Sequence, residues 1–155
     1  MQVFTVTNTK KFMSMLLKEN VFDLFELRNI TITTFSTFEI DGRLNKDYFE
    51  NKDEIKADFC KWSDVKPFAF EIIKGNRLPK FIKLVLSADN ETVSKISPEA
   101  SALFINITFE NNEITIITGS STKTFTMDKR TDIMWDEYVE EFFTNNKIPV
   151  STQAY

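Results

Sequence analysis

The stretch LFINITFENNEITIITGSSTKTFTM, residues 103–127, decides most of the fold that the sequence predicts. Apolar and polar residues alternate on both sides of Asn111-Asn112, which is typical of strands with one buried face. A type I′ turn at these asparagines, which tolerate positive φ, places Phe109 opposite Ile114. The register therefore agrees with the hydrophobic pattern.

A second tight turn is predicted at Ser120-Ser121, where Gly119 would ease the bend. This turn adds a third strand, with Phe125 opposite Ile116, and apolar rows then cross all three strands. We expect a three-stranded antiparallel meander over 103–127 that is covered on one side and exposed to water on the other.

The chain of 155 residues is long enough for one domain, which we place at 1–148, with a C-terminal tail at 149–155. Sixteen Phe and three Gly predict an aromatic core and argue against Gly-rich phosphate loops. No apolar run is long enough to cross a bilayer, and the N-terminus lacks the pattern of a signal peptide, so a cytoplasmic protein is expected. The single cysteine, Cys60, agrees with a reducing compartment.

The sequence contains no histidine, which removes several classes of enzyme. Nucleophiles activated by histidine, histidine zinc sites and histidine proton shuttles are all excluded. Catalysis would have to use carboxylates, lysine, tyrosine or a bound metal. We therefore expect a protein without catalytic residues, metal ligands or a cofactor.

The other elements follow from periodicity and from helix-capping residues. A strand at 2–6 precedes a short helix that begins near Lys10, and strands fill 21–40 with a bulge near Arg28-Asn29. A second helix runs from Val65 to a C-cap at Gly75, and its predicted stripe is Val65, Phe68, Ala69, Ile72 and Ile73. A strand at 81–88 and a loop with a partial helical turn at 89–101 lead to the meander.

A last helix follows Asp128, where either Asp128 or Thr131 can serve as its N-cap. Its apolar stripe is predicted to cover the sheet, because this is the commoner use of such a stripe than a groove for a partner. The stripe contains Met134, Trp135, Tyr138, Val139 and Phe142, and the outer face carries Asp132, Asp136, Glu137, Glu140 and Glu141. The fold class is therefore α+β, an antiparallel sheet packed by two or three helices on one face.

Basic residues are the candidate site for an anion or a nucleic acid. The segment 74–83 holds four of them and no acidic residue, and the first helix adds three more. The candidates are Lys10, Lys11, Lys18, Lys74, Arg77, Lys80 and Lys83. Solvated faces are the simpler explanation, since the net charge is −4 and no aromatic residue is expected beside the basic segment as an exposed stacking platform.

The order of elements resembles the domain of DNA sliding clamps, in which a strand-helix-strands unit occurs twice and helices line one side of the sheet. The resemblance covers most of the chain and depends on topology: the opening strand with its basic helix, the second helix and the meander. It implies a clamp-like fold, association with DNA, and an oligomer, because one such domain cannot encircle a duplex.

Three short phrases also resemble a family of bacterial proteins of about this length that has no assigned activity. They are Thr31-Ile32-Thr33-Thr34-Phe35, Phe38-Glu39-Ile40-Asp41-Gly42-Arg43 and Ile73-Lys74-Gly75-Asn76-Arg77. This resemblance implies no site residue.

Two hypotheses of different classes follow. The first is a non-enzymatic binding or assembly module, clamp-like and associated with nucleic acid, with a homo-oligomer as its form and no membrane partner. The second is a small enzyme or ligand-binding protein that uses Asp41 and Asp47 with Lys74 or Arg77. It requires these groups to converge in one pocket. The loop 41–47 itself lacks the ligand order of an EF-hand and is predicted to be an ordinary turn.

Overall fold

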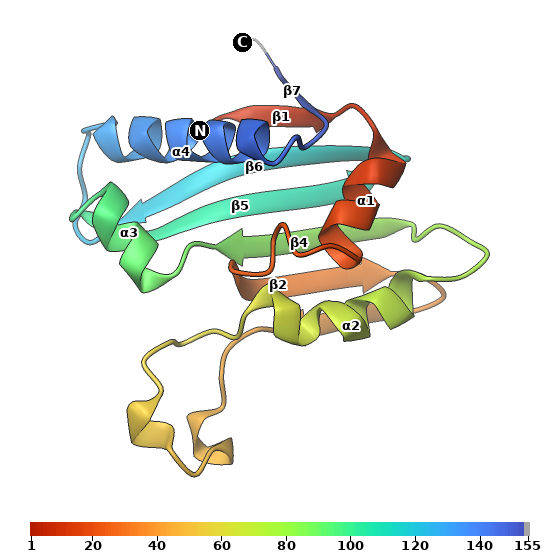
Figure 1. The fold of residues 1–155 in the computed structure, drawn as a ribbon, viewed down its shortest axis with the longest axis horizontal. Coiled ribbons are helices and arrows are strands. Elements are labelled where there is room, and N and C mark those ends of the chain that lie inside the picture. Colours follow the sequence, from red (N-terminus) through yellow and green to blue (C-terminus); the bar gives the residue numbers. More distant parts are fainter. Residues whose placement is uncertain (154–155) are drawn as a thin grey trace.

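The computed structural model describes residues 1–153 and contains one seven-stranded antiparallel sheet in the order β3-β2-β4-β5-β6-β1-β7 (Figure 1). Every pair of neighbouring strands is antiparallel. The strands are β1 (Val3–Val6), β2 (Glu26–Thr33), β3 (Thr37–Asp41), β4 (Phe81–Ser87), β5 (Ala100–Glu110), β6 (Glu113–Thr122) and β7 (Val150–Thr152).

Helices cover one face of this sheet, where alternate strand residues such as Ile82, Leu84 and Leu86 are buried (Figure 1). The α-helices are α1 (Thr9–Leu17), α2 (Trp62–Ile73), α3 (Asn90–Ile96) and α4 (Arg130–Asn145), and short 3₁₀ helices are η1 (Lys46–Tyr48) and η2 (Lys52–Glu54). The α+β class is confirmed. The sheet is larger than the predicted meander, and the described residues form four α-helices rather than two or three.

The hairpin at the centre of the prediction is confirmed. Asn111 and Asn112 have φ of 53° and 61°, as a type I′ turn requires. Phe109 lies opposite Ile114 in the resulting register.

The predicted third strand is wrong, because Ser120-Ser121 is not a turn. Strand β6 continues through both serines, and β1 occupies the predicted place, with Phe4 instead of Phe125 opposite Ile116. Phe125 is 90% exposed. The alternation of apolar and polar residues did not predict the end of β6, because the two positions that face the helices there are the polar Thr118 and Ser120.

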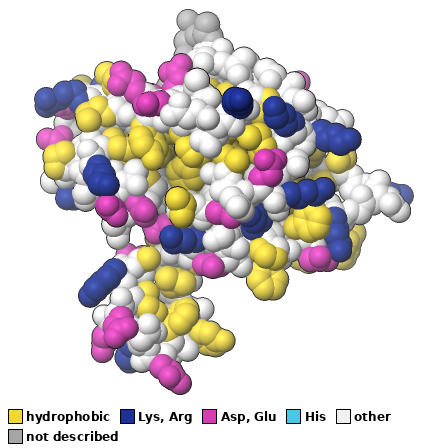
Figure 2. Space-filling model, viewed as in Figure 1, with side chains coloured by type: hydrophobic (Ala, Val, Ile, Leu, Met, Phe, Trp, Pro, Cys, Tyr) yellow, Lys and Arg dark blue, Asp and Glu magenta, His cyan; other side chains and the backbone are white. Residues whose placement is uncertain are grey.

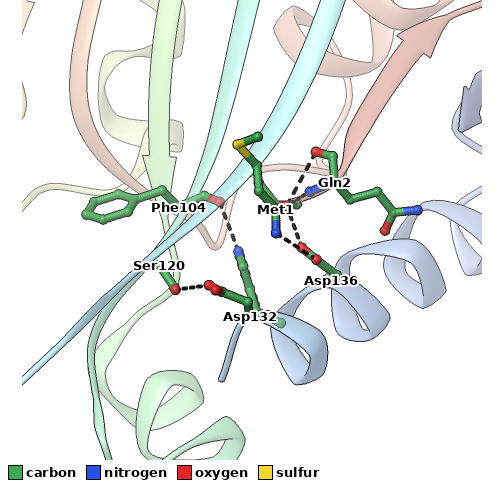
Figure 3. A network of polar contacts seen from close by, with 8 residues as sticks. Met1, Gln2, Phe104, Ser120, Asp132 and Asp136 are labelled. Carbon is green, nitrogen blue, oxygen red and sulfur yellow. Dashed lines mark hydrogen bonds and ion pairs between the residues drawn. The ribbon is translucent and has the colours of Figure 1, made fainter. Parts of the chain in front are cut away.

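Acidic groups of α4 satisfy these two hydroxyls (Figure 3). The hydroxyl of Ser120 donates to Asp132, and that of Thr118 donates to Asp136. The N-terminal ammonium of Met1 lies 3.2 Å from Oδ2 of Asp136. We call this group of five residues the α4 seam. Two of the five acidic residues predicted on the outer face of α4 therefore point toward the sheet.

The buried stripe of α4 is only partly the predicted one. Trp135 and Val139 are fully buried as expected, and Phe143 joins them, whereas Met134 is 45% exposed. Trp135 Nε1 donates to the carbonyl oxygen of Phe104 at 2.9 Å and ties the helix to β5.

Helix α2 is confirmed, and Gly75 follows its end with φ of 149°. Its buried residues are Trp62 and Ala69, whereas Phe68 of the predicted stripe is exposed. Trp62 Nε1 donates to the carbonyl oxygen of Leu16 at 2.9 Å, which joins α2 to α1.

The predicted bulge in β2 is confirmed by a register shift between Leu27 and Asn29. The backbone of Gly42 crosses this strand so closely that a Cβ atom there would lie 1.8 Å from the carbonyl oxygen of Leu27. A side chain at position 42 therefore requires the backbone there to move away from β2.

Two further segments differ from the prediction. Helix α3 forms within the expected loop 89–101, because the side chain of Asp89 caps it by accepting from the backbone N–H of Thr92. At the C-terminus, β7 pairs with β1, so 150–152 belong to the sheet and not to a tail. The last two residues of the predicted tail, 154–155, lie outside the described part of the chain.

The core between the helices and the sheet is aromatic, as expected. Phe4 packs edge-to-face on Phe143, and Phe12 does the same on Phe22. Within residues 1–153, no helix combines the length and the apolar character that crossing a membrane requires.

Candidate functional site

The basic segment 74–80 joins α2 to β4 at one end of the sheet and is almost entirely exposed. The backbone N–H of Lys80 donates to the carbonyl oxygen of Thr33 at 2.9 Å, which holds the segment against the end of β2. The side chains of Lys74, Arg77 and Lys80 project into solvent. Figure 2 shows basic side chains beside hydrophobic ones at this end of the molecule.

A groove of about 740 Å³ separates this segment from the tip of the β2–β3 hairpin, and we call it the hairpin-tip groove. Lys74, Arg77 and Lys80 line one side of it. Phe35 and Phe38 line the other side, with ring centroids 5.7 Å apart in an edge-to-face arrangement.

Phe35 is 93% exposed and was not among the predicted site residues. It lies in a tight turn in which the backbone N–H of Thr34 donates to the carbonyl oxygen of Ser36 at 2.8 Å. The expectation that no exposed aromatic residue accompanies the basic segment is therefore wrong. The signal that could have found it is a turn between the two Thr-rich strands. Such a turn places the Phe35 ring at the tip of a hairpin and therefore in solvent.

Thr34 also lines this groove. Its hydroxyl oxygen is buried and has no hydrogen-bond partner among residues 1–153. Buried polar atoms in folded proteins nearly always have a partner, so this hydroxyl is an exception within the fold.

Five of the seven predicted basic residues line two grooves beside segment 74–80. Lys10 of α1 and Lys18, which follows the end of α1, border a second groove on the other side of segment 74–80, and we call it the α1 groove. Lys74 and Arg77 line both grooves. Lys80 lines the hairpin-tip groove alone.

The two remaining candidates lie elsewhere. Lys11 is exposed on α1 and lines neither groove. Lys83 lies opposite Thr31 and Thr108, on the face of the sheet that the helices leave open. The structure thus gathers five of the seven predicted residues around segment 74–80.

Few carboxylates neutralise this end of the molecule. Lys74 forms an ion pair with Glu71 at 2.8 Å. Within the described residues 1–153, Lys10, Arg77 and Lys80 form no ion pair. These cations are therefore free to meet an external anion.

The residues proposed for an enzyme are not brought together. Asp41 lines a recess of about 190 Å³ that contains neither Lys74 nor Arg77, and its Oδ1 accepts from the backbone N–H of Arg43 at 2.9 Å. Asp47 is exposed in η1. No group of three His, Cys, Asp or Glu side chains in residues 1–153 is arranged to hold a metal ion.

A different carboxylate, Glu26, is perturbed by its surroundings. It is 6% exposed, and burial raises its pKa above the usual value, although the nearby Arg28 guanidinium opposes the shift. That guanidinium lies 3.9 Å from the ring centroid of Phe59, and its Nε donates to the hydroxyl of Ser87. This cluster holds the segment between β3 and α2, residues 42–61, against the sheet. No local motif in the sequence indicated it.

Comparison with known proteins identifies the family of this chain and assigns no activity to it. A family model described as a family of unknown function (DUF5721) matches residues 15–151, and the chain belongs to this family. No curated protein and no solved structure matches the chain.

Proposed function

We propose that this member of the DUF5721 family is a non-enzymatic binding module that holds single-stranded nucleic acid in the hairpin-tip groove. The observation that carries the proposal is the position of the 93% exposed Phe35 ring beside Lys74, Arg77 and Lys80. Proteins that bind single strands combine aromatic rings, on which bases stack, with cations that follow the phosphates.

The groove supplies both components within one concave surface. The ring of Phe38 supports that of Phe35 from the side, so that the outer face of the Phe35 ring is accessible to a base. Arg77 and Lys80 would neutralise the phosphates next to that base.

The overall charge of −4 does not oppose this binding, because three basic residues and one acidic residue, Glu71, line the hairpin-tip groove. Glu137, Glu140 and Glu141 lie on the exposed side of α4, which covers β6 and β1 at the far side of the sheet from β2 (Figure 1). Salt screens charges beyond about 8 Å at physiological ionic strength, so the local cations dominate at the groove. The cytoplasm is the compartment that we propose, since it contains nucleic acid and keeps the free Cys60 reduced.

The test is fluorescence anisotropy with a labelled oligothymidylate of about 16 nucleotides, which covers the larger site sizes of single-strand binders. Phe35→Ala is expected to weaken binding by about 1–3 kcal/mol, roughly five- to hundredfold, because one stacked base is lost. Phe125→Ala is the matched control, since Phe125 is 90% exposed and lies outside the groove. Equal binding by both variants would overturn the proposal.

Salt dependence provides a second measurement on the same complex. The logarithm of the binding constant should fall linearly with the logarithm of salt concentration, and Lys80→Gln should reduce the slope by about 0.7. Lys11→Gln should leave the slope unchanged. Anionic vesicles serve as a competing probe: binding to vesicles that depends on Phe35, without binding to the oligonucleotide, would assign the surface to a membrane instead.

The clamp-like form of this proposal is tested by mass in solution. An assembly of several copies, stable by light scattering at low and high salt, would allow the protein to encircle a duplex. A monomer at every concentration would remove the encircling clamp and leave single-strand binding as proposed.

A further inference from the structure

The α1 groove is a second concave site, with a volume of about 620 Å³, on the opposite side of segment 74–80 from the hairpin-tip groove. Its floor is apolar. Met13 and Leu17 of α1 face Ile82 of β4 and Phe109 of β5 across it. Leu17, Ile82 and Phe109 are buried members of the core, so the floor is a fixed part of the fold.

The rim of the α1 groove is basic. Lys10, Lys18, Lys74 and Arg77 line it, and no Asp or Glu is among its lining residues. Three of these four cations are free of ion pairs within residues 1–153, and Lys18 instead lies 5.9 Å above the ring of Phe70. A set of cations around an apolar floor is complementary to a molecule that is anionic at one end and apolar along the rest of its length.

We propose that the α1 groove binds an amphiphilic anion, in which a carboxylate or a phosphate monoester ends an apolar body. The volume lies within the range of about 300–1,000 Å³ that small-molecule sites occupy. A nucleic acid would leave the apolar floor without a partner, and an uncharged lipid would leave the cations without one. Lys74 and Arg77 line both grooves, but the proposal can be tested apart from the nucleic-acid function, because Lys10, Lys18, Met13 and Leu17 do not line the hairpin-tip groove.

Isothermal titration with decanoate tests the proposal. Saturable binding of one equivalent is expected below the concentration at which decanoate forms micelles. Decanol should bind roughly tenfold to hundredfold more weakly, because hydrogen bonds from the lysines to a charged head group are lost. Decyltrimethylammonium should not bind. Binding of decanol as tight as that of decanoate, or no saturation by decanoate and decyl phosphate, would overturn the proposal.

Two variants locate the binding. Lys10→Gln combined with Lys18→Gln should weaken decanoate binding about tenfold or more, whereas Lys11→Gln should not, since Lys11 lies on the same helix outside the groove. Equal loss in both proteins would overturn the assignment. Decyl phosphate then distinguishes the head groups: tighter binding of the dianion identifies a phosphate monoester, and tighter binding of decanoate identifies a carboxylate.

A cross-check separates this site from the proposed nucleic-acid site. Phe35→Ala should leave decanoate binding intact, and the double lysine variant should leave oligothymidylate binding within about twofold of wild type. A second copy of the chain is the competing occupant of the groove. Self-association that the double lysine variant abolishes, with no binding of decanoate, would assign the groove to that contact and overturn the ligand.

Discussion

The α4 seam and the basic end formed by the two grooves are both rich in charged side chains, but they differ in how those charges are satisfied. In the seam, Asp132 and Asp136 accept hydrogen bonds from Ser120 and Thr118, and Asp136 also pairs with the N-terminal ammonium (Figure 3). At the basic end, most cations find no carboxylate within residues 1–153. Charges that satisfy each other inside a fold stabilise it, whereas charges that face only water remain available for a ligand.

This difference means that substitutions in the seam should change stability, and substitutions at the basic end should change binding. The free energy of unfolding, measured by urea denaturation of the purified protein, distinguishes buried groups that hold the fold together from exposed groups that do not.

Trp135→Ala should cause the largest loss, about 3–5 kcal/mol, because it removes a fully buried ring and the hydrogen bond from its Nε1 to the carbonyl oxygen of Phe104. Met134→Ala is the control on the same helix, and its loss should be below about 1 kcal/mol because Met134 is 45% exposed. Similar losses in both variants would show that α4 is not held to the sheet through this face.

Asp136→Ala should destabilise the protein by about 1–3 kcal/mol, because the hydroxyl of Thr118 and the N-terminal ammonium both lose their acceptor. Glu137→Ala, the exposed neighbour, should change stability by less than about 0.5 kcal/mol. If the two alanine variants unfold at the same urea concentration, the seam does not contribute to stability and the comparison fails.

Glu26→Gln should have the opposite sign and stabilise the protein at pH 7. Burial raises the pKa of Glu26 in the folded state above the ordinary value of 4.5, so the folded protein holds an unfavourable charge at neutral pH. A carboxyl pKa that is raised in the folded state adds stability that is fully present below the unfolded pKa. That contribution is lost as pH rises through the folded pKa. The advantage of the glutamine should therefore shrink as pH falls and disappear below 4.5.

A destabilising Glu26→Gln at pH 7 would contradict this interpretation. It would mean that the ionised carboxylate is held by Arg28 more strongly than burial disfavours it. The urea midpoints of wild type and variant, compared from pH 7 down to pH values below 4.5, give the sign directly.

Lys10→Gln, Lys18→Gln and Arg77→Gln should each change the free energy of unfolding by no more than about 0.5 kcal/mol, the smallest effect of the series. These side chains are exposed, so we expect stability not to depend on their charge. A loss above about 1 kcal/mol in any of them would show that the basic end is structural, and would weaken both binding proposals.

Local residue patterns were sufficient for several parts of the fold. The Asn111-Asn112 turn and the bulge in β2 each follow from the dihedral or face preferences of a few adjacent residues. The existence of α2 and its C-terminal end follow likewise from its periodicity and from Gly75, whereas its start at Trp62 precedes the predicted Val65. The basic residues of segment 74–80 could also be identified as a candidate site, because their charge imbalance is contiguous in the chain.

Contacts between distant segments decided the rest. Alternation shows that a strand has a buried face but does not name its neighbour, so Phe4 of β1 and Phe125 were equally suitable beside Ile116. The end of β6 is polar in sequence and became part of the sheet because α4 supplies two carboxylates to its hydroxyls. In the same way Phe35 and Lys74 line one groove, and Lys10 and Arg77 line another, only when the chain has folded. A binding surface built from separate elements has no signature in any one of them, because its geometry depends on how the core packs.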